Sequence, residues 1–335
     1  MIELPDLLTG MLQMPGAQPE DLLSEMLRRI RVSGSLQYCF MPSGDWQTSA
    51  EPAAYRPKGA VGFHIVAGGT CWVEVEGIRL ELEEGDIVAF PFGTAHVVGS
   101  GIGGTVVDPA SLLPPLPWQH IPLIHFGKGG ENTRLLCGYI ECSALAFLPF
   151  GSTLPKVIHV SMHATTDWLV DVVQQIIHEV DEPGSAGMPI LERLSEIVLL
   201  EVLRRELLRL PSDKTGWVAA IQDPVVGRCL RLIHSEPAQP WTLQQLARHS
   251  AVSRAVLMQR FAQLLTTSPI RYLRDWRLYL AAERLRYSQV SIADLAVEAG
   301  YSCEAAFNRA FARTQGCPPA AFRFKFRAGE GQASH

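Results

Sequence analysis

Hydrophobic residues follow different spacings in different parts of the chain. From about residue 34 to residue 160, short apolar runs are separated by glycines and prolines, which is typical of strands joined by tight turns. Four of these runs are 61–66, Cys71–Val75, Ile87–Phe90 and 135–140. Many short strands of this kind predict a β-sandwich or a β-barrel.

Helical spacing flanks this β region. Apolar residues recur every three or four positions in 4–14, in 22–30 and again in 166–210, where the second half carries a wide apolar stripe. After a linker at 211–216, six polar residues each precede an apolar-periodic stretch, as helix-capping residues do. These predicted helix starts are Asp223, Thr242, Ser253, Ser268, Ser291 and Ser302.

The spacings together predict an α+β protein with a β-barrel in the first half and an all-α domain in the second. We expect a β domain with N-terminal helices at 1–160, a helical dimerisation or linker segment at 161–216, the all-α domain at 217–328 and a disordered tail at 329–335. No apolar run reaches the roughly 18–20 residues of a membrane span, and the first residues lack the features of a signal peptide. We therefore expect a cytoplasmic protein with no membrane partner.

Charge is distributed unequally between the two halves. The net charge is −5, yet residues 218–328 carry 15 basic and 7 acidic side chains, whereas residues 1–217 carry 14 and 26. A basic domain attracts a polyanion through phosphate contacts and counterion release, and an acidic domain is repelled by it. The charge of the second half therefore favours a nucleic acid as its partner.

One pattern occurs twice in the all-α half. A Leu-Ala pair, a break and a serine occur at 246–253 and again 49 residues later at 295–302. The stretch that follows carries two apolar anchors, Leu257 and Phe261 in the first copy and Phe307 and Phe311 in the second. A short helix, a tight turn and a longer helix make a helix-turn-helix unit, whose second helix enters the DNA major groove.

With these anchors turned inward, eight residues face outward and are the candidates for DNA contact. Arginine can bond both acceptors of a guanine edge, and glutamine can bond an adenine edge in the same way. Arg309 could therefore bond a guanine, and Gln259 an adenine. The basic segment 269–286 would hold the two units so that both recognition helices enter one face of the DNA, about 34 Å apart. The eight candidates are Arg254, Ala255, Met258, Gln259, Glu304, Ala305, Asn308 and Arg309.

Residues 218–327 resemble the DNA-binding domain of the AraC/XylS family of bacterial transcription regulators. The resemblance rests on 241–247, 269–277, 292–302 and, most specifically, 306–319. It implies a sequence-specific regulator, an activator or a repressor, that is not an enzyme, with double-stranded promoter DNA and RNA polymerase as partners. It also implies that the eight outward residues contact DNA. Ala255 and Met258 depart from the family pattern, because relatives often have hydrogen-bonding side chains there. This departure leaves Arg309 as the strongest single candidate for a base contact.

The β region resembles a cupin barrel. Residues 85–96 have the spacing G-x5-P-x-G-x2-H of the second cupin motif. Upstream, His64 begins a stretch similar to the first motif, H-x-H-x4-E, although Val66 replaces the second histidine and Cys71 replaces the carboxylate. The whole chain thus resembles AraC-family regulators with an N-terminal cupin-type sensor, which implies a cupin-like β-barrel with flanking helices and control by a small-molecule, metal or redox signal.

Four residues of the sensor region form a candidate metal site. Histidine and thiolate ligands together favour zinc, and His64, Cys71, His96 and Cys137 would make a closed tetrahedron with no position left for catalysis. Two alternatives stay open. The histidines bond backbone groups while the cysteines pack as small hydrophobic residues, or Cys71 and Cys137 respond to oxidants as accessible thiolates.

We therefore expect a homodimeric regulator with an unknown effector in the barrel and zinc as the candidate cofactor. The apolar helices at 166–210 would make the contact between subunits. Two other functions stay open: a metal-dependent cupin oxygenase or isomerase with an appended domain, against which the altered first motif weighs, and an architectural DNA binder without an effector. Affinity that depends on salt and not on sequence would mark the architectural binder.

Overall fold

The computed structural model describes residue 24 and residues 32–50, 60–102, 104–115, 117–142, 154–162, 168–209 and 215–332. The two helices expected before residue 31 lie outside these ranges, apart from Ser24. Within them, no helix is both long enough and apolar enough to cross a membrane.

The predicted cupin-like domain is built from two β-sheets. One sheet has six strands, in the order β11 (Ile158–Val160), β6 (Ile87–Phe90), β3 (Ala60–Gly68), β10 (Arg134–Cys142), β1 (Val32–Pro42) and β9 (Leu123–Phe126). The other has five, in the order β5 (Ile78–Leu82), β4 (Cys71–Val75), β7 (His96–Gly99), β2 (Trp46–Ala50) and β8 (Thr105–Val106). A short 3-10 helix at Pro109–Leu112 follows β8.

Large side chains from both sheets fill the space between them. Phe40 and Phe90 come from the six-stranded sheet, Trp46 comes from the five-stranded sheet, and all three are fully buried. The Phe40 and Trp46 rings meet edge to face, with centroids 5.3 Å apart. The interior of the domain is therefore a packed core.

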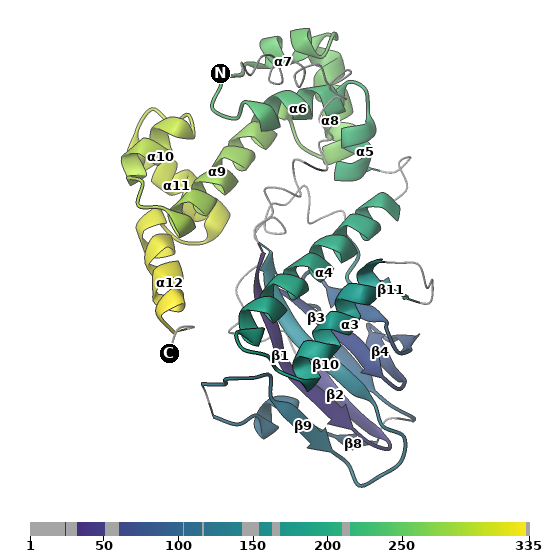
Figure 1. Ribbon diagram of the computed structural model, residues 1–335. Helices are drawn as coiled ribbons and strands as arrows, with labels where there is room; N and C mark the ends of the chain where they lie inside the picture. The colour runs from purple at the N-terminus through teal and green to yellow at the C-terminus, as the bar shows by residue number, and fades with distance from the viewer. Residues whose placement is uncertain are drawn as a thin grey trace, which may run out of the picture.

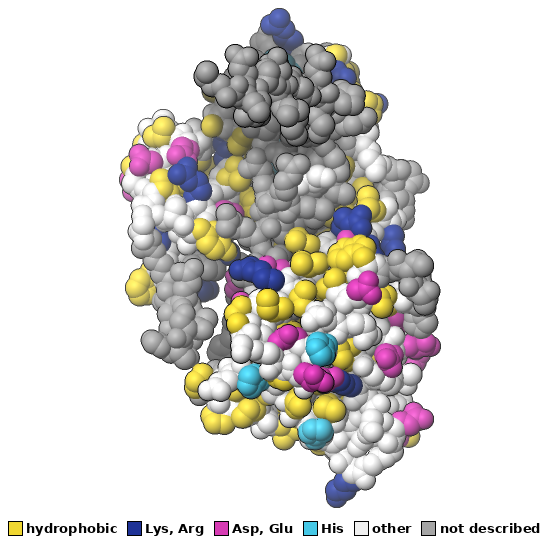
Figure 2. All heavy atoms as spheres, in the orientation of Figure 1, with side chains coloured by type: hydrophobic (Ala, Val, Ile, Leu, Met, Phe, Trp, Pro, Cys, Tyr) yellow, Lys and Arg dark blue, Asp and Glu magenta, His cyan; other side chains and the backbone are white. Residues whose placement is uncertain are grey.

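Two helices cover the outer face of the six-stranded sheet (Figure 1). They are α3 (Trp168–Asp181) and α4 (Gly187–Arg209). Their inward residues share a hydrophobic core with β1, β3 and β10, and Arg134 of β10 also pairs with Asp181 of α3. The outward side of α4 is not fully polar, since Figure 2 shows hydrophobic side chains gathered over this helix.

The second half is all-α, as the sequence predicts. Two groups of helices lie at opposite ends of the long helix α9 (Figure 1). The helices are α5 (Trp217–Gln222), α6 (Val226–Ser235), α7 (Leu243–His249), α8 (Arg254–Leu265), α9 (Pro269–Tyr287), α10 (Ile292–Glu298), α11 (Glu304–Gln315) and α12 (Pro319–Gln332).

The predicted capping residues set most of these helix starts. Thr242 forms a capping box with Gln245, and Ser253, Ser268 and Ser291 each accept a hydrogen bond from a backbone amide of the first turn. Ser302 was the wrong residue, because the N-cap of α11 is Cys303, whose side chain makes no capping bond.

The C-terminal end also differs from the expectation. Helix α12 continues to Gln332, past the point where the disordered tail was predicted to begin, and residues 333–335 lie outside the described ranges.

A buried hydrogen-bond network joins three helices of the first helical group. The Trp217 indole donates to the Tyr272 hydroxyl at 3.0 Å, and that hydroxyl lies 2.8 Å from Nε2 of His234. Because an indole can only donate, the tyrosine accepts from it and gives its own proton to His234. Burial raises the pKa of Tyr272, so the hydroxyl keeps this proton.

Replacing Tyr272 by Phe should lower the free energy of unfolding by about 1–3 kcal/mol, because it leaves two buried polar groups without their partner. Urea unfolding of the full chain, followed by helical circular dichroism, measures this loss. Tyr301→Phe is the matched control, since the Tyr301 hydroxyl is buried and has no hydrogen-bond partner among the described residues. Equal losses in the two variants would contradict the role of the network.

Candidate nucleic-acid interface and sensor cluster

The first helix-turn-helix unit consists of α7 and α8. Leu257 and Phe261 of α8 are fully buried, as the sequence predicts for its anchors. The four outward candidates on this helix are all exposed, namely Arg254, Ala255, Met258 and Gln259. The side of α8 opposite Leu257 and Phe261 therefore faces solvent.

The second unit repeats this arrangement with α10 and α11. Phe307 and Phe311 are fully buried, while Glu304, Ala305 and Arg309 are exposed. Asn308 differs from the other candidates because it is half-buried, and its side-chain oxygen is buried with no hydrogen-bond partner among the described residues. DNA contact by these eight residues stays a prediction.

The arginines of the helical domain fall into two groups. Several form ion pairs within the protein: Arg260 pairs with Asp223, Arg284 pairs with Glu298, and Arg274 pairs with Asp275. Arg254 and Arg309 have no ion-pair partner among the described residues, so their charge stays available to a polyanion.

Arg313 is a further exposed arginine that the sequence analysis missed. It lies one helical turn after Arg309 on α11, so the two side chains lie on the same side of the helix. This four-residue spacing is the signal that could have identified it.

The structure brings three of the four predicted metal ligands together, from β3, β7 and β10. Nε2 of His64 lies 3.0 Å from Nε2 of His96, and Nδ1 of His64 lies 3.1 Å from the Cys137 sulfur. His96 also stacks on Phe90, and its Nδ1 lies 2.7 Å from the carbonyl oxygen of Thr94. His64 therefore lies between His96 and Cys137.

The direction of these hydrogen bonds follows from the Thr94 carbonyl, which can only accept. Nδ1 of His96 must donate to it, so Nε2 of a neutral His96 accepts a proton from His64. Nδ1 of His64 then accepts from the Cys137 thiol. Burial raises the pKa of Cys137, which is consistent with a thiol that keeps its proton.

These contacts do not fit a closed zinc site. His64 uses opposite ring nitrogens toward His96 and Cys137, so the three side chains do not converge on one point, and the described residues contain no group of three His, Cys, Asp or Glu that could hold a metal. Cys71 is buried in the core between the sheets. Zinc binding stays a prediction, and the geometry favours the alternative of hydrogen-bonded histidines and packed cysteines.

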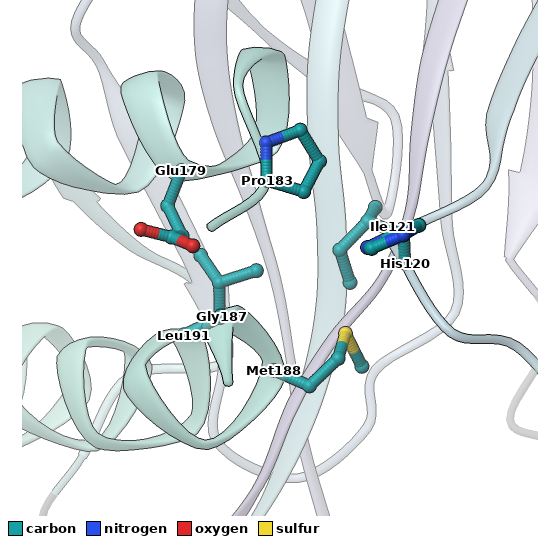
Figure 3. A pocket seen from close by; sticks show the side chains of 7 residues that line it. All are labelled: His120, Ile121, Glu179, Pro183, Gly187, Met188 and Leu191. Carbon is teal, nitrogen blue, oxygen red and sulfur yellow. The ribbon is translucent and has the colours of Figure 1, made fainter. Parts of the chain in front are cut away.

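The structure has a small hollow on the outside of the β domain, which bears on where an effector can bind. The hollow in Figure 3 lies outside the sheets, between the turn that joins α3 to α4 and the segment containing His120 and Ile121. Its free volume is about 10 Å³, roughly the room of one water molecule. Glu179, which lines it, accepts a hydrogen bond from the Gly184 amide and so closes the turn. An effector between the sheets would have to displace core side chains.

Comparison with known proteins agrees with both halves of the chain. Residues 21–207 match a cupin family, and residues 246–325 match a helix-turn-helix domain family. An AraC-like transcription regulator of Streptomyces lividans is 32% identical over 310 residues, which cover 91% of this chain and 97% of that protein. The chain belongs to the AraC-type transcription regulators.

A second AraC-like regulator, from Streptomyces antibioticus, is 29% identical over 91% of this chain and 97% of its own length. Among solved structures, ToxT from Vibrio cholerae matches 89% of this chain and 98% of that chain, with 10% identity and a TM-score of 0.35. The relatives confirm that this AraC-type regulator is a DNA-binding protein of transcription control, as the helix-turn-helix repeat predicts.

In this AraC-type regulator, one ion pair joins the sensor domain to the second helix-turn-helix unit. Glu141 of β10 lies 3.6 Å from Arg286 of α9, whose side chain is only 10% exposed. The Arg286 guanidinium also lies over the Phe322 ring of α12. Burial raises the pKa of Glu141, and the charge of Arg286 opposes this effect. Since alternate strand residues share a face, Glu141 and Cys137 lie on the same side of β10.

Iodoacetamide at pH 7 should label Cys303 of the native regulator and leave Cys71 and Cys137 unmodified. Cys303 is exposed, whereas the other two thiols are buried, and burial raises the pKa of Cys71 to about 12. A thiol with a raised pKa stays protonated and unreactive at pH 7. Peptide mass spectrometry measures the labels, and urea-unfolded protein is the control in which all cysteines react. Rapid labelling of native Cys137 would instead support the oxidant-sensing alternative.

Proposed function

We propose that this protein is a cytoplasmic, homodimeric, non-enzymatic activator that binds a two-part promoter site and recruits RNA polymerase in response to a signal at its cupin-type domain. The observation that carries the proposal is the pair of recognition helices, α8 and α11, at opposite ends of α9 (Figure 1). Arg254 and Arg309 on these helices have no ion-pair partner among the described residues, whereas Arg271, Arg274 and Arg284 of α9 each pair with a carboxylate. Free charge near base-reading side chains supports both affinity and specificity.

The Glu141–Arg286 pair supports control of the helical domain by the sensor domain. A signal acts only through different affinities for two states of the whole protein. A shift of β10 caused by a change at His64 and Cys137 would alter the position of Glu141, and Arg286 would transmit that change to α9 and α12. The effector is a small molecule or a redox or metal signal that changes this hydrogen-bonded cluster.

The hydrogen-bonded cluster of His64, His96 and Cys137 also favours a regulatory role for the cupin-type domain over an enzymatic role. A metal-dependent oxygenase needs histidine nitrogens that face an open metal position. Here His64 engages both ring nitrogens with protein groups, and the first cupin motif has lost a histidine and the carboxylate.

An apolar stripe on α4 supports the homodimer. Ile190, Ile197 and Leu208 are 49%, 41% and 60% exposed. They are separated by 7 and 11 residues, which is about two and three helical turns, so the three side chains lie on one side of the helix. A two-fold contact would bury the same stripe on both copies.

Ile197→Asp should convert the dimer to a monomer, because it places a charge in the centre of this stripe. Sedimentation velocity at micromolar concentration measures the change. Ile102→Asp is the matched control, since Ile102 is 92% exposed and lies in a turn of the β domain. Dissociation by both variants, or by neither, would contradict the assignment of the interface to α4.

A genome-fragment binding selection at physiological salt tests the proposed function. Enrichment of one motif with two half-sites supports it, and binding without sequence preference would instead indicate an architectural DNA binder.

On the enriched site, Arg309→Ala should cost about 1–3 kcal/mol and relax specificity at one base pair, because a bidentate contact to guanine is lost. Fluorescence anisotropy with single-base variants of the site measures both effects. Arg228→Ala is the control, because it removes one positive charge from an exposed position on α6, outside the two recognition helices. Equal weakening on every sequence would mean that Arg309 contacts a phosphate.

A further inference from the structure

The two helix-turn-helix units have separate hydrophobic cores that meet only along α9 in the clusters of buried residues that the structure describes. Trp276 and Tyr279 of α9 belong to the core of the first unit. Leu278 and Leu285 belong to the core of the second. The orientation of one recognition helix relative to the other therefore depends on α9 and on whatever side chain contacts both units.

Arg277, in the middle of α9, contacts the first unit through hydrogen bonds. Its Nε donates to the Pro237 carbonyl at 2.6 Å, and its Nη2 donates to the Gln239 carbonyl at 2.7 Å. Both carbonyls belong to the loop that joins α6 to α7. Two bonds from one planar guanidinium hold this loop in both position and direction.

The same guanidinium contacts the turn of the second unit. Gly300, which separates α10 from α11, has a φ of +80°. A Cβ atom at this position would lie 2.5 Å from Nη1 of Arg277 and 3.4 Å from its Cζ. Because Nε and Nη2 are already bonded, the guanidinium cannot move away without losing those bonds. The turn that orients α11 is thus packed directly against a group fixed to the first unit.

We propose that Arg277 is a positioning residue that fixes the separation and angle of the two recognition helices, and so the spacing of the two half-sites that the protein accepts. This inference rests on the proposed two-part binding site. Arg277 is half-buried and its Nε and Nη2 are committed to protein carbonyls, so it acts by holding the α6–α7 loop and the turn at Gly300, and not by contacting DNA itself.

Binding to a set of DNA duplexes tests this inference. The set carries the selected site with its spacer shortened or lengthened in steps of one base pair, and two duplexes carry one half-site each. The full chain is compared with Arg277→Lys and Arg277→Met. Lysine keeps the charge but lacks the planar fork, so it cannot hold both carbonyls and the Gly300 turn. Arg274→Met is the matched control, because Arg274 lies on the same helix and its only ion-pair partner among the described residues is Asp275.

The unsubstituted protein and Arg274→Met should lose roughly tenfold in affinity for each step away from the preferred spacer, comparable to the loss for a mismatched base pair. Both Arg277 variants should lose most of this preference, while their affinity for each single half-site stays within about twofold, the usual range for independent sites. Arg277→Lys keeps the test valid if Arg277→Met does not fold.

A spacer preference in Arg277→Lys as sharp as that of the unsubstituted protein would overturn the inference. An equal loss of affinity on single half-sites and on the two-part site would also overturn it, since that result indicates a purely structural or phosphate-binding role. If the unsubstituted protein selects no sequence, the proposed function itself fails, which is a different result from unchanged spacer preference.

Discussion

The structure of the DNA-binding half depends on one constraint: helix α9 belongs to two hydrophobic cores at once. Neighbouring positions of this helix face different units, with Trp276 turned toward the first core and Leu278 toward the second. A buried helix shared in this way restricts movement between the units, because protein cores are packed closely and resist deformation. The contacts of Arg277 with both units restrict it further. Two recognition helices held at fixed positions can read two segments of one DNA duplex, which a single unit cannot do.

The sensor domain combines a closely packed core with a small cluster of polar side chains. Its two sheets bury a core of large aromatic and aliphatic side chains, which fill the space between the sheets. Beside this core, His64, His96 and Cys137 satisfy one another by hydrogen bonds. A cluster that is satisfied internally changes when a proton, an oxidant or a ligand alters one member, which suits a sensor better than a catalyst.

Sequence patterns predicted the features that depend on local chemistry. Thr242 and Ser253 cap helices because their side chains bond amides only a few residues away, and Leu257 is buried because helical spacing places it beside Phe261. The predicted ligands His64, His96 and Cys137 do meet in space. Their ring orientations, and therefore the lack of a common metal position, depend on side-chain rotamers that no spacing reveals. The contacts of Arg277 and Glu141 join segments that are far apart in the chain, and sequence spacing does not predict such contacts.

The most direct test of the central claim, that α9 holds both recognition helices for simultaneous reading of one duplex, is hydroxyl-radical footprinting of the full chain on its selected site. The account predicts two protected segments on the same face of the DNA, with centres about one helical turn apart. A single protected segment, or two segments on opposite faces of the duplex, would contradict it.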